Sequence, residues 1–215
     1  MSGSDQEQVE LVVRTIAQTA VDNEKYFGDL DAVVGDGDFG YSLARGFEKV
    51  LEGWDEFDRA DIGTFLKKIG MVVSSRIGGT SGPIWGTAFL KAGITAGSTD
   101  RLSGEQVVAM LRAATDGIKA RGQAELGDKT LLDALVPMTD RIEQELAAGA
   151  EPGAVLAAAA ATAKEAAEST VDMVAKRGRA SYTGERSRGS VDAGAMAVAV
   201  IVERINEAWP SGGAS

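Results

Sequence analysis

The chain has 215 residues, among which 22 Lys and Arg stand against 32 Asp and Glu, and it contains neither His nor Cys. This composition excludes disulfide bonds, thiolate chemistry, a Ser-His-Asp triad, a phosphohistidine and imidazole ligands to a metal. The net charge of −10 argues against a nucleic-acid partner, and the lack of a long apolar run or a signal-peptide pattern argues against a membrane, so we expect a cytoplasmic protein.

Apolar residues recur at helical spacing along almost the whole chain, and no segment alternates as a strand would. Ser103 followed by Gln106 forms a capping-box pattern, and Pro152 suits the first turn of a helix. The periodicity predicts eight helices, over residues 5–26, 39–53, 60–76, 82–97, 103–121, 130–148, 152–176 and 192–209. We therefore expect an all-α fold, an eight-helix antiparallel up-and-down barrel or bundle that forms a single domain over residues 1–209, with a disordered tail at 210–215.

Four glycine-rich polar loops interrupt the helical pattern, and we call them the first to fourth loops: 28–38, 77–82, 122–130 and 177–191. In the predicted bundle they are the first, third, fifth and seventh connections. Alternate connections of an up-and-down bundle lie at the same end. The four loops should therefore meet at one end and form a shared site.

The first loop holds three aspartates within eight residues, Asp31, Asp36 and Asp38, separated by glycines. Carboxylates this close repel one another, and a hard cation such as Mg²⁺ or Ca²⁺ is the usual reason to hold them together. An EF-hand is excluded, because the sixth and twelfth positions counted from Asp36 are Tyr41 and Phe47 rather than Gly and Glu. The alternative is a solvated acidic turn.

The second loop brings three glycines together with Thr80 and Ser81 at the start of a predicted helix. Free backbone N–H groups and the helix dipole favour phosphate at such a place, and the hydroxyls can add hydrogen bonds. The Gly-Lys-Thr ending of a Walker loop is missing. The alternative is a tight turn between two helices.

The third loop ends in Asp128 and Lys129 ahead of a predicted helix. Asp128 suits the N-cap of that helix. Lys129 could pair with phosphate or lie in solvent. Taken alone, this loop favours a structural role.

The fourth loop and the residue before it carry five cations within residues 176–188 of an acidic chain. Arg grips phosphate through a fork of donors, and the embedded glycines and hydroxyls favour anion recognition over a solvated run of charge. Asp192 follows, and its carboxylate could cap the last helix or bind a ligand. Together the acidic, glycine-rich and basic loops indicate a site for a metal and a nucleotide.

Four motifs also carry a family resemblance. They are Leu30-Asp31 with Gly35-Asp36-Gly37-Asp38, Gly78-Gly79-Thr80-Ser81-Gly82-Pro83, Gly127-Asp128-Lys129-Thr130, and Gly178-Arg179-Ala180-Ser181-Tyr182 with Gly184-Glu185-Arg186-Ser187. With them the chain resembles, over nearly its whole length, the nucleotide-binding L subunit of dihydroxyacetone kinases, which also occurs as the C-terminal domain of single-chain ATP-dependent forms. The resemblance implies an eight-helix antiparallel barrel with the nucleotide bound at one end.

The resemblance also implies the residues of the site. Asp31, Asp36 and Asp38 would hold two Mg²⁺ ions and, with Arg179, would carry the catalysis. The residues implied to line the ATP or ADP are Phe39, Gly40, Tyr41, Ser42, Gly79, Thr80, Ser81, Gly122, Leu131, Arg179, Asp192, Ala193 and Gly194.

The implied activity is phosphoryl transfer to a small ketose of the dihydroxyacetone type, which a separate K subunit holds through a His, so this chain alone would be inactive. Phosphate would come from ATP, or from bound ADP recharged by a phosphotransferase-system protein. The family usually has His where this chain has Phe39 and Asn where it has Ser42, which points to a paralogue for another ketose such as erythrulose. The alternative is a regulatory ADP-binding module that contacts a transcription regulator.

Overall fold

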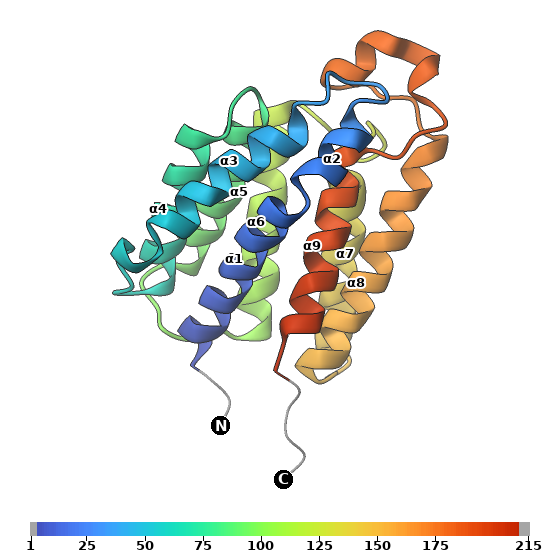
Figure 1. Cartoon of the computed structure of the whole chain (residues 1–215). Helices are drawn as coiled ribbons and strands as arrows, with labels where there is room; N and C mark the ends of the chain where they lie inside the picture. Colours follow the sequence, from blue (N-terminus) through green and yellow to red (C-terminus); the bar gives the residue numbers. More distant parts are fainter. Residues whose placement is uncertain (1–3, 211–215) are drawn as a thin grey trace.

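The computed structural model describes residues 4–210, and these fold into nine α-helices and three short 3₁₀ segments without a strand (Figure 1). The α-helices are α1 Asp5–Asp22, α2 Glu24–Asp31, α3 Phe39–Glu52, α4 Ile62–Arg76, α5 Ser81–Ala96, α6 Gly104–Gly122, α7 Leu132–Ala147, α8 Pro152–Ser169 and α9 Ala193–Ala208. The 3₁₀ segments are Trp54–Glu56, Thr170–Asp172 and Arg179–Ser187. The predicted all-α class is confirmed.

The long helices close into a ring. From α3 to α9 each helix packs on the next, and α1 packs against both α3 and α9. The short helix α2 follows α1 and packs on α3 and α9. In Figure 1, α1 begins and α9 ends at one end of the ring, and the loop between α2 and α3 lies at the other.

The helix predicted over residues 5–26 is broken at Asn23, which ends α1 and precedes α2. The Asn23 side-chain amide donates a hydrogen bond of 2.9 Å to the Thr19 carbonyl, and such local bonds compete with helix continuation. α2 then runs to Asp31, so residues 28–31 of the predicted first loop are helical. The metal candidate Asp31 therefore sits at the end of a helix, and the described chain has one α-helix more than predicted.

The helix predicted over residues 152–176 ends early, at Ser169, because Thr170 turns the chain. The buried Thr170 hydroxyl donates to the Ala167 carbonyl and accepts the N–H of Asp192, at 2.6 and 2.8 Å. It thus joins the end of α8 to the start of α9. The fourth loop, predicted as irregular, contains the 3₁₀ segment Arg179–Ser187, which is interrupted by a kink at Gly184.

Gly40 allows the start of α3 to lie directly against α2. A Cβ atom at this position would come within 2.0 Å of the Glu24 carbonyl oxygen and 2.5 Å of the Gly28 nitrogen. Any larger residue would push the two helices apart. The close contact brings Asp38, just before α3, next to Asp31 at the end of α2.

Other local predictions are confirmed. Ser103 and Gln106 form the capping box of α6, and Pro152 occupies the first turn of α8. Among residues 4–210, no helix combines the length and the apolarity that a membrane crossing requires. Apart from Pro210, the tail predicted at 210–215 lies outside the described residues.

Candidate metal and nucleotide site

The four loops meet at one end of the helical ring, as predicted, and surround a cavity of about 450 Å³. Each loop contributes to its wall: Asp36 from the first, Thr80 from the second, Gly122 from the third and Arg179 from the fourth. Apart from Gly40, Tyr41 and Ser42, every residue predicted for the site lines this cavity.

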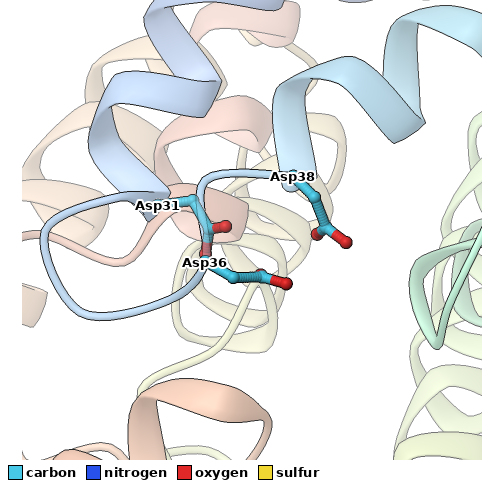
Figure 2. A group of neighbouring side chains, drawn as sticks. All are labelled: Asp31, Asp36 and Asp38. Carbon is cyan, nitrogen blue, oxygen red and sulfur yellow. The ribbon is translucent and has the colours of Figure 1, made fainter.

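The three aspartates form a compact cluster at one side of the cavity. One carboxylate oxygen from each of Asp31, Asp36 and Asp38 lies within 4.8 Å of the other two. Figure 2 shows the side chains gathered from the end of α2, the following loop and the residue before α3. Oxygen donors alone, at this spacing, fit a hard divalent cation such as Mg²⁺.

The backbone of the first loop is shaped around Asp31. Its carboxylate accepts the N–H groups of Gly37 and Phe39, at 2.9 and 3.4 Å. A Cβ atom at Gly35 would lie 2.3 Å from the other Asp31 oxygen, so only glycine fits there. The glycines that separate the aspartates therefore let the chain fold closely around one carboxylate.

Burial raises the pKa of the Asp31 carboxyl group, although the N–H groups of Phe39 and Gly37 act in the opposite direction. The neighbouring carboxylates of Asp36 and Asp38 raise this pKa further. Each effect disfavours the ionised cluster in the absence of a positive charge. A bound cation would compensate for both effects, so the donor set fits a metal site better than a solvated turn.

Arg179 supplies positive charge to the same cluster in this structure. Its guanidinium forms an ion pair with Asp36, and one of its nitrogens lies 3.8 Å from a carboxylate oxygen of Asp38. The side chain remains 64% exposed. An exposed arginine held against carboxylates can turn to another anion in the cavity at little cost.

The second loop presents a helix N-terminus to the cavity. α5 begins at Ser81, and among the described residues no side chain caps its first turn. Gly79, Thr80 and Ser81 all line the cavity, and Gly79 has a φ of +62° that favours glycine. The free N–H groups and the hydroxyls are thus available to an anion.

Part of the cavity wall is apolar, which the motifs did not predict apart from Leu131. It comprises Ile84 on α5, Ile118 on α6, and Ala124, Leu131 and Leu132 before and within α7. Ile118, Ala124 and Leu132 also form a small buried cluster of their own. In the sequence, Ile84, Ile118 and Leu132 read as ordinary helix core and Ala124 as part of a loop, and only the fold shows that they border the cavity.

Gly40, Tyr41 and Ser42 do not border the cavity in this structure, and their contact with a nucleotide stays a prediction. Successive residues of a helix point about 100° apart, so Gly40 and Tyr41 point away from the cavity face of Phe39, whereas Ser42 returns close to that face. Gly40 is buried against α2, and the exposed ring of Tyr41 lies beneath the guanidinium of Arg45, 5.2 Å away. Ser42 faces Gly78.

The third loop differs from its prediction. Asp128 is not an N-cap, because α7 begins only at Leu132. Asp128 instead accepts the N–H of Glu125, the main cause of its lowered pKa, and pairs with Lys176 and Arg177. Lys129 lies neither in solvent nor free for phosphate, because it is buried and bonded to backbone carbonyls.

Asp192 combines the two roles left open for it. Its carboxylate caps α9 by accepting the Ala195 N–H at 2.7 Å, and it also lines the cavity. Burial raises the pKa of this carboxyl group to about 7, although the Ala195 N–H lowers it. Gly194 next to it also borders the cavity, where a Cβ would lie 3.1 Å from the Asp192 carboxylate.

Comparison with known families now adds to this geometry. The model of the DAK2 domain matches residues 33–207. The chain belongs to the DAK2-domain family. The ADP-binding subunit DhaL of the PEP-dependent dihydroxyacetone kinase of Escherichia coli is a relative with 40% identity, which covers 84% of this chain and 86% of that protein.

Two further proteins that this chain resembles are larger. The L-erythrulose 1-kinase of Mycolicibacterium smegmatis is 38% identical over 91% of this chain and 34% of its own length. A crystal structure of the dihydroxyacetone kinase from C. freundii in complex with AMP-PNP and Mg²⁺ matches with a TM-score of 0.71 and 27% identity, over 94% of this chain and 34% of that one. The chain thus spans about a third of both.

Proposed function

We propose that this chain is the nucleotide-binding, phosphoryl-transfer subunit of a kinase for dihydroxyacetone or a related small ketose. One observation carries the proposal: three clustered carboxylates, an exposed arginine and an uncapped helix N-terminus surround the same cavity. The named relatives support it, since the E. coli protein is an ADP-binding subunit of a dihydroxyacetone kinase and the C. freundii enzyme was crystallised with AMP-PNP and Mg²⁺.

The two walls of the cavity suit the two parts of a nucleotide. The base would lie against the apolar wall around Ile118 and Leu132, which excludes water from its faces. The phosphates would extend towards Thr80, Ser81 and the N–H groups at the start of α5. Asp31, Asp36 and Asp38 would hold Mg²⁺, two ions in our proposal, and the metal when bound would neutralise phosphate charge.

Arg179 would change partners when the nucleotide enters. With the carboxylates engaged by metal, its guanidinium would leave Asp36 and pair with phosphate oxygens, two of which its planar fork of donors can bind at once. Phosphoryl transfer depends on such positioning and on charge stabilisation, so no His is needed in this chain. We therefore assign Arg179, with the three aspartates, to the catalytic machinery.

The ketose would be held by a separate K-type subunit, and the chain alone would be inactive. The cavity has features for a nucleotide, and the chain has no His that could attach a ketose covalently. The relative from E. coli is described as PEP-dependent and ADP-binding. That description favours the route in which bound ADP is recharged by a phosphotransferase-system protein over exchange of free ATP.

Calorimetry with Mg-ADP and Mg-AMP-PNP tests the proposal. Asp36→Asn and Asp38→Asn should weaken binding of both while leaving the helical circular dichroism unchanged. Asp100→Asn, a matched change of an exposed aspartate in the connection between α5 and α6, should bind as the unmodified chain does. Unchanged affinity in both cluster variants would sink the metal assignment.

A further inference from the structure

The segment from Val171 to Ser190, which includes most of the fourth loop and the residues before it, is closed at its base by hydrogen bonds between its two ends. The N–H of Gly189 donates to the Val171 carbonyl, and the N–H of Ala175 donates to the Ser187 hydroxyl, both at 2.8 Å. Ser187 is fully buried. The exposed tip, which carries Arg179, thus extends from a closed base.

Lys129 lies inside this base. Its ammonium donates to the carbonyls of Met173, Ser187 and Ser190, at 3.2, 2.6 and 2.6 Å. These carbonyls belong to the two sides of the loop base, so one side chain holds both. Lys129 is 2% exposed and has a φ of +61°, a strained conformation for a residue with a side chain.

The ammonium group has three donors, and all three are engaged by these carbonyls. It therefore has no hydrogen to offer a phosphate in the neighbouring cavity. Burial lowers the pKa of Lys129, whereas the charge of Asp192 raises it. A buried ammonium group that donates only to backbone carbonyls has a structural role, because it holds the segments that carry those carbonyls in place.

Asp128 holds the same loop at its entry. Its backbone carbonyl accepts the N–H of Lys176 at 3.0 Å, and its carboxylate pairs with Lys176 and Arg177, at 3.3 and 3.2 Å. The Lys176 ammonium in turn donates to the Gly127 carbonyl at 3.0 Å. Arg179, two residues further on, reaches Asp36.

We propose that Lys129 and Asp128 are positioning residues, a clasp from the third loop that fixes the base of the fourth loop so that Arg179 faces the aspartates and the phosphates of a bound nucleotide. The clasp acts through Arg179 and touches no phosphate. The role of the clasp in nucleotide binding rests on the proposed function. The contacts by which Lys129 and Asp128 hold the loop are a property of the free protein.

Hydrogen–deuterium exchange of the free protein tests the hold on the loop. Lys129→Met should speed exchange across residues 173–190 at least tenfold while the amides of α4 and α5 keep their protection. Asp128→Asn should act in the same direction, which keeps the test valid if Lys129→Met folds poorly. Lys164→Met, on the exposed face of α8, is the matched control and should change neither region.

Coupling to Arg179 tests the positioning role. In calorimetry with Mg-AMP-PNP, Arg179→Gln should lower the affinity roughly 10- to 100-fold, the range for a lost charge-assisted hydrogen bond. Lys129→Met should lower it by a similar or smaller factor. The double variant should be no weaker than Arg179→Gln alone, because the clasp acts only through that side chain.

The outcomes are distinguishable. If the unmodified chain binds no nucleotide, the proposed function fails, and exchange still decides whether the clasp holds the loop. Unchanged exchange in both Lys129→Met and Asp128→Asn overturns the clasp. If the double variant loses as much binding free energy for Mg-AMP-PNP as the two single variants together, Lys129 acts independently of Arg179 and the positioning role is overturned.

Discussion

Removing one aspartate of the cluster should have opposite effects on the free and the bound protein. In Asp36→Asn, repulsion from Asp31 and Asp38 disappears, and so does the attraction to Arg179. The carboxylate oxygens lie within 4.8 Å of one another, and at that upper limit two charges repel by about 0.9 kcal/mol in a water-like dielectric, so relieving two pairs gives about 1.7 kcal/mol. The lost ion pair, which is largely exposed, offsets about 1 kcal/mol of this.

The free variant should therefore be slightly more stable than the unmodified chain, by roughly 0.5–1 kcal/mol. For a chain of 215 residues this corresponds to a rise of about 1–4 °C in melting temperature. Mg-ADP at a hundred times its dissociation constant should add about 2.7 kcal/mol to the unmodified chain. At the same concentration the variant should gain much less, because its metal site is incomplete.

Melting scans in EDTA and in Mg-ADP, followed by circular dichroism, measure both effects, with Asp100→Asn as the control. A free Asp36→Asn that melts several degrees lower, with an undiminished response to Mg-ADP, would refute the reasoning. In that case the cluster would be a structural network held by Arg179, and the nucleotide would bind without it.

Three other expectations concern pH, substrate choice and the partner. The pKa of Asp192 is about 7 in the folded chain against an ordinary 3.8, so its contribution to stability is complete below pH 3.8 and is lost as the pH rises towards 7. Melting temperature should thus fall between pH 5 and 7.5, and less so in Asp192→Asn, which retains a capping side chain. Phe39 lines the cavity beside the ring of Phe27, and we expect it to influence substrate choice. Phe39→His, assayed with the cognate partner, should change the rates or the preference between three- and four-carbon ketoses. Unchanged rates and an unchanged preference would contradict this. The purified chain should phosphorylate no free ketose until a K subunit is added, and efficient turnover alone would overturn the half-enzyme proposal.

The sequence predicted the features that depend on local pattern. Helical periodicity located the long helices, and the alternation of connections predicted which loops would meet. Its errors lie where one side chain overrides the periodicity. Asn23 breaks a helix that its apolar pattern would continue, and Thr170 ends α8 before its predicted end. Neither side-chain bond can be seen in a hydrophobic pattern.

Within the site, the sequence predicted which charged residues matter better than it predicted the groups that they contact. The close spacing of Asp31, Asp36 and Asp38 predicted a metal site, because clustered carboxylates repel one another. The sequence did not predict the role of Lys129. A lysine among polar residues reads as solvated or as a phosphate ligand, and only the fold brings the carbonyls of Met173 and Ser187 around it. Contacts to backbone from residues 44 and 58 positions away leave no trace in local composition.

If the acidic cluster binds a metal as proposed, the arrangement of charges would explain how the cluster can exist without it. The aspartates come from the junction of α2 and α3, where Gly40 and Gly35 allow the close backbone packing that places the three carboxylates near one another. Arg179 comes from a loop tip on the opposite side and is mostly exposed, so it can move. Under the proposed function, a closely packed anionic half faced by an exposed guanidinium would let Arg179 neutralise the carboxylates in the free protein and phosphate in the bound one. By changing partners in this way, Arg179 would limit the repulsion between unpaired negative charges in both the free and the nucleotide-bound protein.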